Sequence, residues 1–234
     1  MSDKKKRLEF LRRSAKEVRN YHVHMRLALI VLGMLVLLLT AIYTISAVYK
    51  DSGSLTVSIN KVDMTKYGLT LSEREDLSHR TSYLTADITE SMTNIAAEQI
   101  PENVDAIDGE HNGQNYIAYT FYLMNAGDVE FSYEYAINLS NVTNSLDEAI
   151  RLRLYVDGVP TTYAKTSSDG TGPERNTTEF ASATVMARGR TDAFAPGDVT
   201  KFTIVVWIEG NDPDCIDLLI GGTLKMDMTI SVAH

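Results

Sequence analysis

The longest apolar stretch of the chain lies near its N-terminus. Residues 27–49 contain no charged side chain and are bounded by Arg26 on one side and Lys50 on the other. A helix of this length spans about 35 Å, slightly more than the bilayer's hydrocarbon core of about 30 Å. A soluble helix buried on all sides needs a large α-rich domain around it, and the rest of the chain is not strongly helical. The pattern therefore predicts a single transmembrane helix over residues 27–49.

Beyond residue 50 the dominant pattern has a period of two. In residues 54–60, Leu55, Val57 and Ile59 alternate with polar side chains, which is typical of a half-buried strand. Alternation or a strongly β-forming composition predicts further strands over residues 83–88, 115–124, 131–139, 150–156, 159–165, 199–208 and 223–232. Short strands without long helices between them predict a mainly β domain over residues 50–234, an antiparallel jelly-roll or Ig-like β-sandwich.

The pattern weakens in residues 61–115, where acids, Ser and Thr become more frequent. Residues 72–75 have the spacing of a capping box that opens a short helical turn, and residues 94–99 read as a helical turn that ends before Pro101. A further turn is predicted at 146–149, and residues 166–176 form a polar loop. We interpret residues 61–115 as an excursion within one domain.

Charge divides the chain into two opposite parts. Residues 1–26 hold nine basic and three acidic side chains, a net charge of +6, and the remaining 13 basic and 28 acidic residues give −15. Basic flanks stay on the cytosolic side of a membrane. We therefore expect a cytosolic headpiece at 1–26, a single-pass anchor and an ectodomain on the cell surface. The headpiece is either a basic amphipathic helix on the inner leaflet or a loosely folded charge cluster.

Two features concern processing and source. The stretch before Val48 ends in Ile45-Ser46-Ala47, which leaves cleavage after Ala47 as the alternative to a retained anchor. Cys215 is the one cysteine of the chain and cannot pair within it, whereas a secreted animal domain of this size commonly contains disulfides. This favours a bacterial cell surface.

Several segments carry a family resemblance: TFYLMNAG (120–127), LDEAIRLRLYVDG (146–158), APGDVTKFTIVVWIEGNDPDC (195–215) and GGTLKMDM (221–228). In this order they resemble the camelysin and TasA-type family of bacterial surface and biofilm-fibre proteins, from residue 54 to the C-terminus. The resemblance implies a jelly-roll fold, a Gram-positive cell envelope and, for some relatives, assembly into matrix fibres. The long basic headpiece departs from the compact cleavable signal of that family.

Camelysin-like proteins have been classed as metallopeptidases, so that activity is the alternative function. A zinc peptidase needs ligands at fixed spacing and a carboxylate base, as in H-E-x-x-H, and the sequence has no such motif. His79, His111 and His234 are widely separated. Two acidic groups qualify as calcium candidates: Asp105, Asp108 and Glu110, and then Asp212, Asp214 and Asp217 beside Glu209. Neither has the regular spacing of an EF-hand loop, and solvated acidic loops are the simpler interpretation.

These patterns predict a membrane-anchored surface protein with a structural or adhesive role in the envelope or biofilm matrix. We expect no cofactor and no nucleic-acid partner. The strand that contains Leu55, Val57 and Ile59 is the candidate assembly strand, because it follows the span directly and lacks a tight hairpin to its successor. A sensor that couples the ectodomain to the headpiece is a further alternative.

Overall fold

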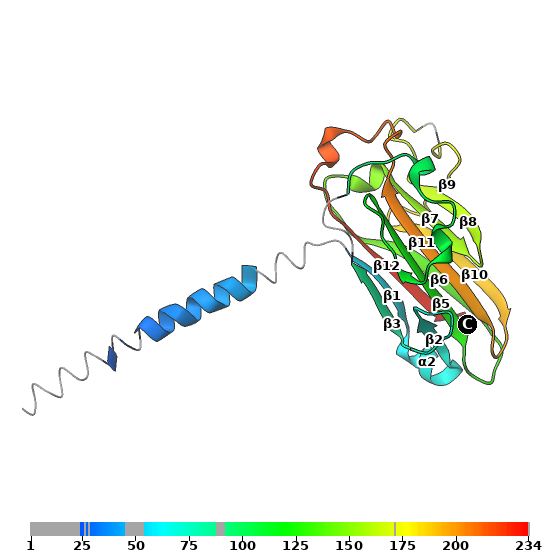
Figure 1. The fold of residues 1–234 in the computed structure, drawn as a ribbon, viewed down its shortest axis with the longest axis horizontal. Coiled ribbons are helices and arrows are strands. Elements are labelled where there is room, and N and C mark those ends of the chain that lie inside the picture. The colour runs from blue at the N-terminus through cyan, green and yellow to red at the C-terminus, as the bar shows by residue number, and fades with distance from the viewer. Residues whose placement is uncertain are drawn as a thin grey trace, which may run out of the picture. The chain divides into compact units, whose positions relative to one another are not determined.

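The structure is a computed structural model that describes residues 24–25, 27, 29–44, 54–87, 92–170 and 172–233. The chain separates into two units, Met1–Asp51 and Ser52–His234. In the first unit residues 29–44 are helical, within the range predicted to span the membrane (Figure 1). Among the described residues, no helix reaches the length and apolarity required to cross a bilayer. The headpiece to residue 23 and residues 45–49 lie outside the described residues.

The second unit is mainly β, as the sequence predicts, and its described strands form two sheets in a sandwich-like arrangement (Figure 1). The five-stranded sheet has the order β10 (Val185–Phe194), β6 (Phe131–Val142), β12 (Leu224–Val232), β1 (Ser54–Ile59) and β3 (Tyr83–Asp87). The seven-stranded sheet has the order β2 (Leu69–Ser72), β5 (Tyr116–Asn125), β11 (Val199–Ile208), β7 (Ile150–Val156), β8 (Val159–Ala164) and β9 (Thr178–Glu179), with β4 (Gly109–Glu110) paired to β5. Helical segments are short: α2 (Lys61–Tyr67), η1 (Ala97–Gln99), η2 (Val104–Ala106), η3 (Leu146–Glu148) and η4 (Asp217–Leu219).

Strand direction departs from the antiparallel expectation at two places. β1 runs parallel to β12, with Ser54 opposite Lys225 and Ile59 opposite Ile230, and β8 runs parallel to β9. The other sheet pairings are antiparallel. Because β1 has β12 on one side and β3 on the other, it lies inside its sheet.

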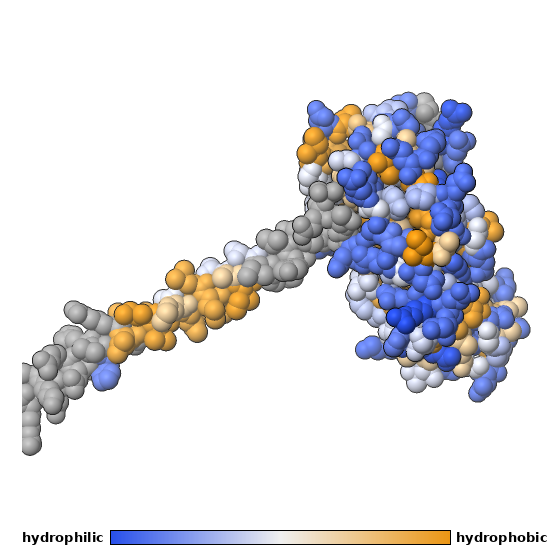
Figure 2. All heavy atoms as spheres, viewed as in Figure 1, coloured by the Kyte–Doolittle hydropathy of each residue, from blue (hydrophilic) through white to orange (hydrophobic). Residues whose placement is uncertain are grey.

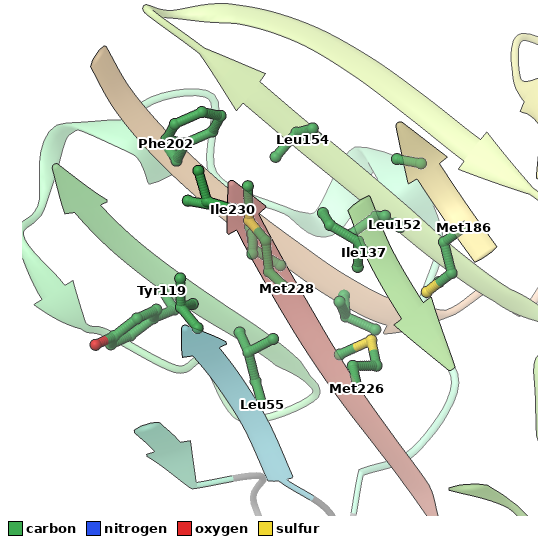
Figure 3. Close-up of a cluster of buried hydrophobic side chains, with 14 of the residues drawn as sticks. Leu55, Tyr119, Ile137, Leu152, Leu154, Met186, Phe202, Met226, Met228 and Ile230 are labelled. Atoms are coloured by element: carbon green, nitrogen blue, oxygen red, sulfur yellow. The ribbon is translucent and has the colours of Figure 1, made fainter. Parts of the chain in front are cut away.

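The main core fills the space between the sheets (Figure 3). Leu55 from β1, Ile137 from β6 and Met228 from β12 meet Leu152 from β7 and Phe202 from β11, all fully buried. The rings of Phe121 and Phe202 stack with centroids 5.3 Å apart. This alternation of buried and outward positions is the one that the period-two pattern predicts for β1 and β12.

A second, smaller core covers the outer face of the seven-stranded sheet. Trp207 and Val205 of β11 are fully buried there beneath Ile95, Ile100 and Val104 of the excursion. The excursion therefore supplies a third apolar layer, which explains why β11 is apolar on both faces.

The sequence pattern did not predict β10, α2 or β2, nor the short elements β4, β9, η2 and η4. In β10, Arg188, Gly189 and Arg190 interrupt the apolar pattern, and the register shifts twice along its pairing with β6. The helical turn predicted to open at Ser72 is not a helix in the structure, which has bends and turns at residues 73–76. Ser72 ends β2, and its hydroxyl accepts the backbone N–H of Arg74 at 3.1 Å, a local turn that competes with helix formation.

Candidate functional site

A cleft of about 830 Å³ lies on the outer face of the seven-stranded sheet. β7 contributes Arg151 and Arg153, β8 contributes Thr162, and η1 contributes Glu98. Glu102, residues 174–177, Glu209 and Asn211 form the rest of the polar wall, and Ile100 and Trp207 are among its apolar residues. The lining thus carries three arginines and four glutamates, so its charges are largely matched within the protein.

The indole of Trp207 lies at the centre of a network of polar contacts at this cleft. Its Nε1 donates to Oε2 of Glu209 at 2.9 Å, and Oε1 of Glu209 accepts the backbone N–H of Asn211 at 3.1 Å. The guanidinium of Arg153 lies over the indole ring, 5.1 Å from its centroid, and its Nε donates to Thr162 at 3.2 Å. These contacts fix the turn after β11 and leave the indole fully buried rather than available for stacking on a ligand.

Three carboxylates converge beside the cleft. One oxygen atom each from Glu174, Asp212 and Asp214 lies within 4.8 Å of the others, and we call these residues the carboxylate cluster. The guanidinium of Arg151 enters it, with Nη2 2.5 Å from Oδ2 of Asp212 and 3.8 Å from Oε2 of Glu174. Asp214 accepts the backbone N–H and the hydroxyl of Ser168, at 3.1 and 2.5 Å. The cluster therefore joins β7, the polar loop and the turn after β11.

The carboxylate cluster is the part of the described chain that tests the calcium prediction. It contains Asp212 and Asp214 as expected, adds Glu174, which the sequence did not indicate, and does not include Asp217, which begins η4. Calcium needs several oxygen ligands free to bind it. Here Arg151, with a side chain only 5% exposed, already occupies one face of Asp212, so the donor set fits an ion-pair network better than a calcium site.

In the other acidic group that the sequence offered for calcium, Asp108 and Glu110 accept hydrogen bonds from the protein itself. The hydroxyl of Tyr122 donates to Oδ1 of Asp108 at 2.6 Å, and the other oxygen of Asp108 accepts the backbone N–H of Glu75 at 3.1 Å. Burial, reinforced by the Asp108 carboxylate, raises the pKa of Tyr122. Glu110 accepts hydrogen bonds from Asn112 and from the backbone of Asp87. Asp105 takes part in none of these hydrogen bonds. The contact between Tyr122 and Asp108 holds the excursion against β5, whereas those of Glu110 join segments within the excursion.

The described histidines do not form a zinc site. Both ring nitrogens of His111 face backbone carbonyl oxygens, those of Gly109 at 2.8 Å and Val104 at 2.7 Å. His79 is exposed, and the one group of metal-ligating side chains found among the described residues contains no histidine. His234 lies outside the described residues. The peptidase alternative therefore gains no ligand set from the described part of the chain.

The candidate assembly strand is not an edge strand, contrary to the expectation. Leu55, Val57 and Ile59 of β1 are buried in the main core, and its backbone pairs with both β12 and β3. The expectation was wrong because residues 83–87 return as β3 and cover the outer side of β1. The edges of this sheet are β3, which has five residues, and β10, which carries register shifts and charged side chains. Both are typical ways of protecting an edge.

Comparison with known proteins adds weak likenesses in solved structures. No family model matches the chain, and no curated protein does. The crystal structure of a β-glucosidase from Kluyveromyces marxianus in complex with glucose aligns at 11% identity over 75% of this chain and 17% of that one, with a TM-score of 0.26. The selenomethionine-labelled β-glucosidase from the same organism aligns at 11% identity over 76% and 19%, with a TM-score of 0.25. The chain thus spans less than a fifth of the length of these structures. Likeness at this level carries no inference about fold family or function.

Proposed function

We propose that this chain is a membrane-anchored bacterial cell-surface protein whose β-sandwich ectodomain has a structural or adhesive role in the envelope or biofilm matrix. The observation that carries the proposal is the apolar helix that precedes the domain. Every large apolar side chain described between residues 29 and 43 is at least 52% exposed, and Figure 2 shows this segment as a continuous apolar surface. Such a surface is stable in lipid and not in water.

The proposed span extends from residue 27 to residue 49, beyond the described helical residues. The headpiece charge of +6 supports a cytosolic N-terminus, and the −15 of the remainder supports an ectodomain outside the cell. The finer fold class, a jelly roll or Ig-like sandwich, belongs to the same proposal. It is supported by a chain that changes sheet at each of the steps β5–β6, β6–β7, β10–β11 and β11–β12.

Self-association is the second part of the proposal, and it is assigned to β1. This strand is the first of the ectodomain, so it can leave its position between β12 and β3 without any other strand being threaded past it. An empty position there would expose two unpaired strand edges and the apolar contacts of Leu55, Val57 and Ile59. While the anchor is in the bilayer, β1 fills the position in its own chain. Release after Ala47 would let it fill the position in a neighbour.

The test uses a chain in which Cys215→Ser removes the native thiol. Thr56→Cys and Thr85→Cys are then introduced, which face each other across β1 and β3 on the side away from the core. Cells are oxidised, membranes are washed with carbonate, and the proteins are separated on non-reducing gels. We expect the full chain in the membrane pellet with its disulfide formed within one molecule. The released form that begins at Val48 should instead give ladders of linked subunits.

The variant with Thr56→Cys and Cys215→Ser is the matched control, since its single thiol cannot link more than two chains. Recovery of the full chain in the carbonate wash would show that the anchor is wrong. Released chains linked only within themselves would remove β1 exchange and leave a monomeric anchored domain.

A further inference from the structure

Three large apolar side chains crowd the tip of one ectodomain loop. Ile216, Leu218 and Ile220 are 56%, 66% and 75% exposed. Leu218 lies in η4, and the other two residues flank it. We call residues 216–220 the apolar tip. The other exposed large apolar side chains described in the domain are separated from one another along the sequence: Val62, Tyr83, Ile107, Val129, Val159 and Val199. Figure 2 shows apolar atoms at the end of the domain where η4 lies in Figure 1. An exposed cluster of this kind marks an interaction surface, whereas single exposed residues do not.

Hydrogen bonds within the domain hold the backbone of the apolar tip in place. The N–H of Leu219 donates to the carbonyl of Ile216 at 3.0 Å, and the N–H of Ile220 donates to the carbonyl of Asp217 at 3.2 Å. The side chain of Asn144 donates to the carbonyl of Ile220 at 2.9 Å. Leu219 itself is buried in the main core, which fixes the turn to the domain. A tip of this construction can enter an apolar phase without leaving these groups unsatisfied.

Strand register places the apolar tip at the end of the domain where the chain enters it. The tip leads directly into β12 at Leu224, and Ser54 at the start of β1 lies opposite Lys225 in β12. The far end of the sandwich carries α2 and the β7–β8 turn instead (Figure 1). If the proposed span ends at Tyr49, four residues connect it to Ser54, a reach of only about 13 Å. The end that carries the tip is therefore the end held next to the bilayer.

We propose that the apolar tip inserts into the outer leaflet of the membrane that anchors the chain, so that the ectodomain is attached to the bilayer at two points. This inference rests on the proposed anchor. Insertion of apolar side chains at the interface follows from the area that they remove from water. The carboxylate of Asp217 stays at the level of the headgroups. Because the tip has this acidic residue and no basic one, insertion depends on the apolar side chains and not on anionic lipid.

The experiment measures the depth of the tip in the full chain, reconstituted in phosphatidylcholine vesicles. Cys215, which is partly buried, is first replaced by Cys215→Ser so that a single spin label can be attached at Leu218→Cys. Its collision rates with oxygen, which partitions into lipid, and with a water-soluble nickel chelate are compared by electron paramagnetic resonance. The matched control is Val159→Cys, an apolar position of similar exposure, 68% against 66%, at the far end of the domain.

We expect the label at 218 to collide preferentially with oxygen and the label at 159 to collide preferentially with the nickel chelate. Adding Ile216→Ser and Ile220→Ser to the 218-labelled chain should abolish the preference for oxygen. This second variant separates insertion by the tip from mere closeness imposed by the tether, since the tether is unchanged. Persistence of the preference in that variant would overturn the proposal.

Flotation of carbonate-washed vesicles reports separately on the anchor. A chain that floats while the label at 218 behaves like the one at 159 overturns the insertion of the tip and leaves the anchor intact. A chain that does not float overturns the anchor and the inference with it. A label at 218 that is shielded from both reagents and broadens with protein density would identify a second copy as the partner, which also overturns the proposal.

Discussion

At the scale of single residues, Arg151 joins three separate parts of the sequence. It stands on β7, and its guanidinium meets Asp212 from the turn after β11 and Glu174 from the polar loop. The side chain of Asp212 is fully buried and that of Arg151 nearly so. A buried pair is costly to break because the remaining charge has lost both water and its partner.

We predict that Arg151→Met lowers the free energy of unfolding by about 3–5 kcal/mol, measured by urea denaturation of the ectodomain. The double variant Arg151→Met with Asp212→Leu should recover most of this loss, because it removes both charges. Arg190→Met serves as the control. Its ion pairs with Glu134 and Asp192 are solvent-exposed, and surface pairs contribute little. Equal losses for Arg151→Met and Arg190→Met would contradict the structural role of the cluster.

At the scale of elements, α2 packs closely against the β5–β6 turn. Asn60 caps α2 by accepting the N–H of Val62 at 3.0 Å, and Gly68 ends the helix in the left-handed region at φ 73°. The backbone at Gly127 lies against this end. Asn125, fully buried, donates to the carbonyls of Val129 and Phe194 and accepts the N–H of Gly127, which closes the turn.

We predict that Gly127→Ala destabilises the ectodomain by about 1–3 kcal/mol, as overpacking does at other well-packed sites. A Cβ at Gly127 would lie 2.1 Å from the carbonyl oxygen of Tyr67, so the end of α2 must shift. Gly210→Ala is the matched control, because its Cβ would come no closer than 3.4 Å to Asn94. Thermal melting monitored by circular dichroism compares the two, and a melting temperature unaffected by Gly127→Ala would show that α2 does not press on the turn.

Whether the sequence predicts a strand depends on which of its faces are covered and on whether it lies at the edge of its sheet. β1, β7 and β12 have one face against the main core, and their apolar side chains alternate accordingly. β5 and β11 have both faces covered and carry apolar side chains on both, so all five strands were recognisable. β10 lies at an edge, where charged residues and register shifts protect the sheet and also remove the pattern.

In the candidate site, the sequence could predict only the contacts between residues that are close to one another along the chain. Asp212 and Asp214 are two residues apart in one turn, so their closeness follows from the sequence. Glu174 and Arg151 join them only because the polar loop and β7 meet in space. The same limit applied to β1, whose pairing with β12 depends on residues at the other end of the domain.

At the scale of the whole molecule, the β-sandwich unit has two apolar cores among its described residues and the lone thiol of Cys215. A domain of this size buries about 70% of the surface that its unfolded chain exposes, enough to fold without covalent or metal crosslinks. We predict that the melting temperature of residues 50–234 is unchanged by a chelator or by a reductant, measured by scanning calorimetry. Calcium added back after chelation is the control. A fall with chelator that calcium reverses would instead assign a bound cation to the carboxylate cluster.

The parallel pairing of β1 with β12 also determines when the molecule can finish folding. These are the first and last strands of the ectodomain, so the contact from Ser54 to Lys225 closes a loop that contains every other strand. Contacts between such distant residues form slowly, because the chain entropy of closing the loop must be overcome first. Under the proposed topology, in which the chain is exported from its N-terminal anchor, β1 would leave the translocation channel first, and the sheet could close only after the last residues had followed. The flank of β1 that pairs with β12 would then need protection during that interval.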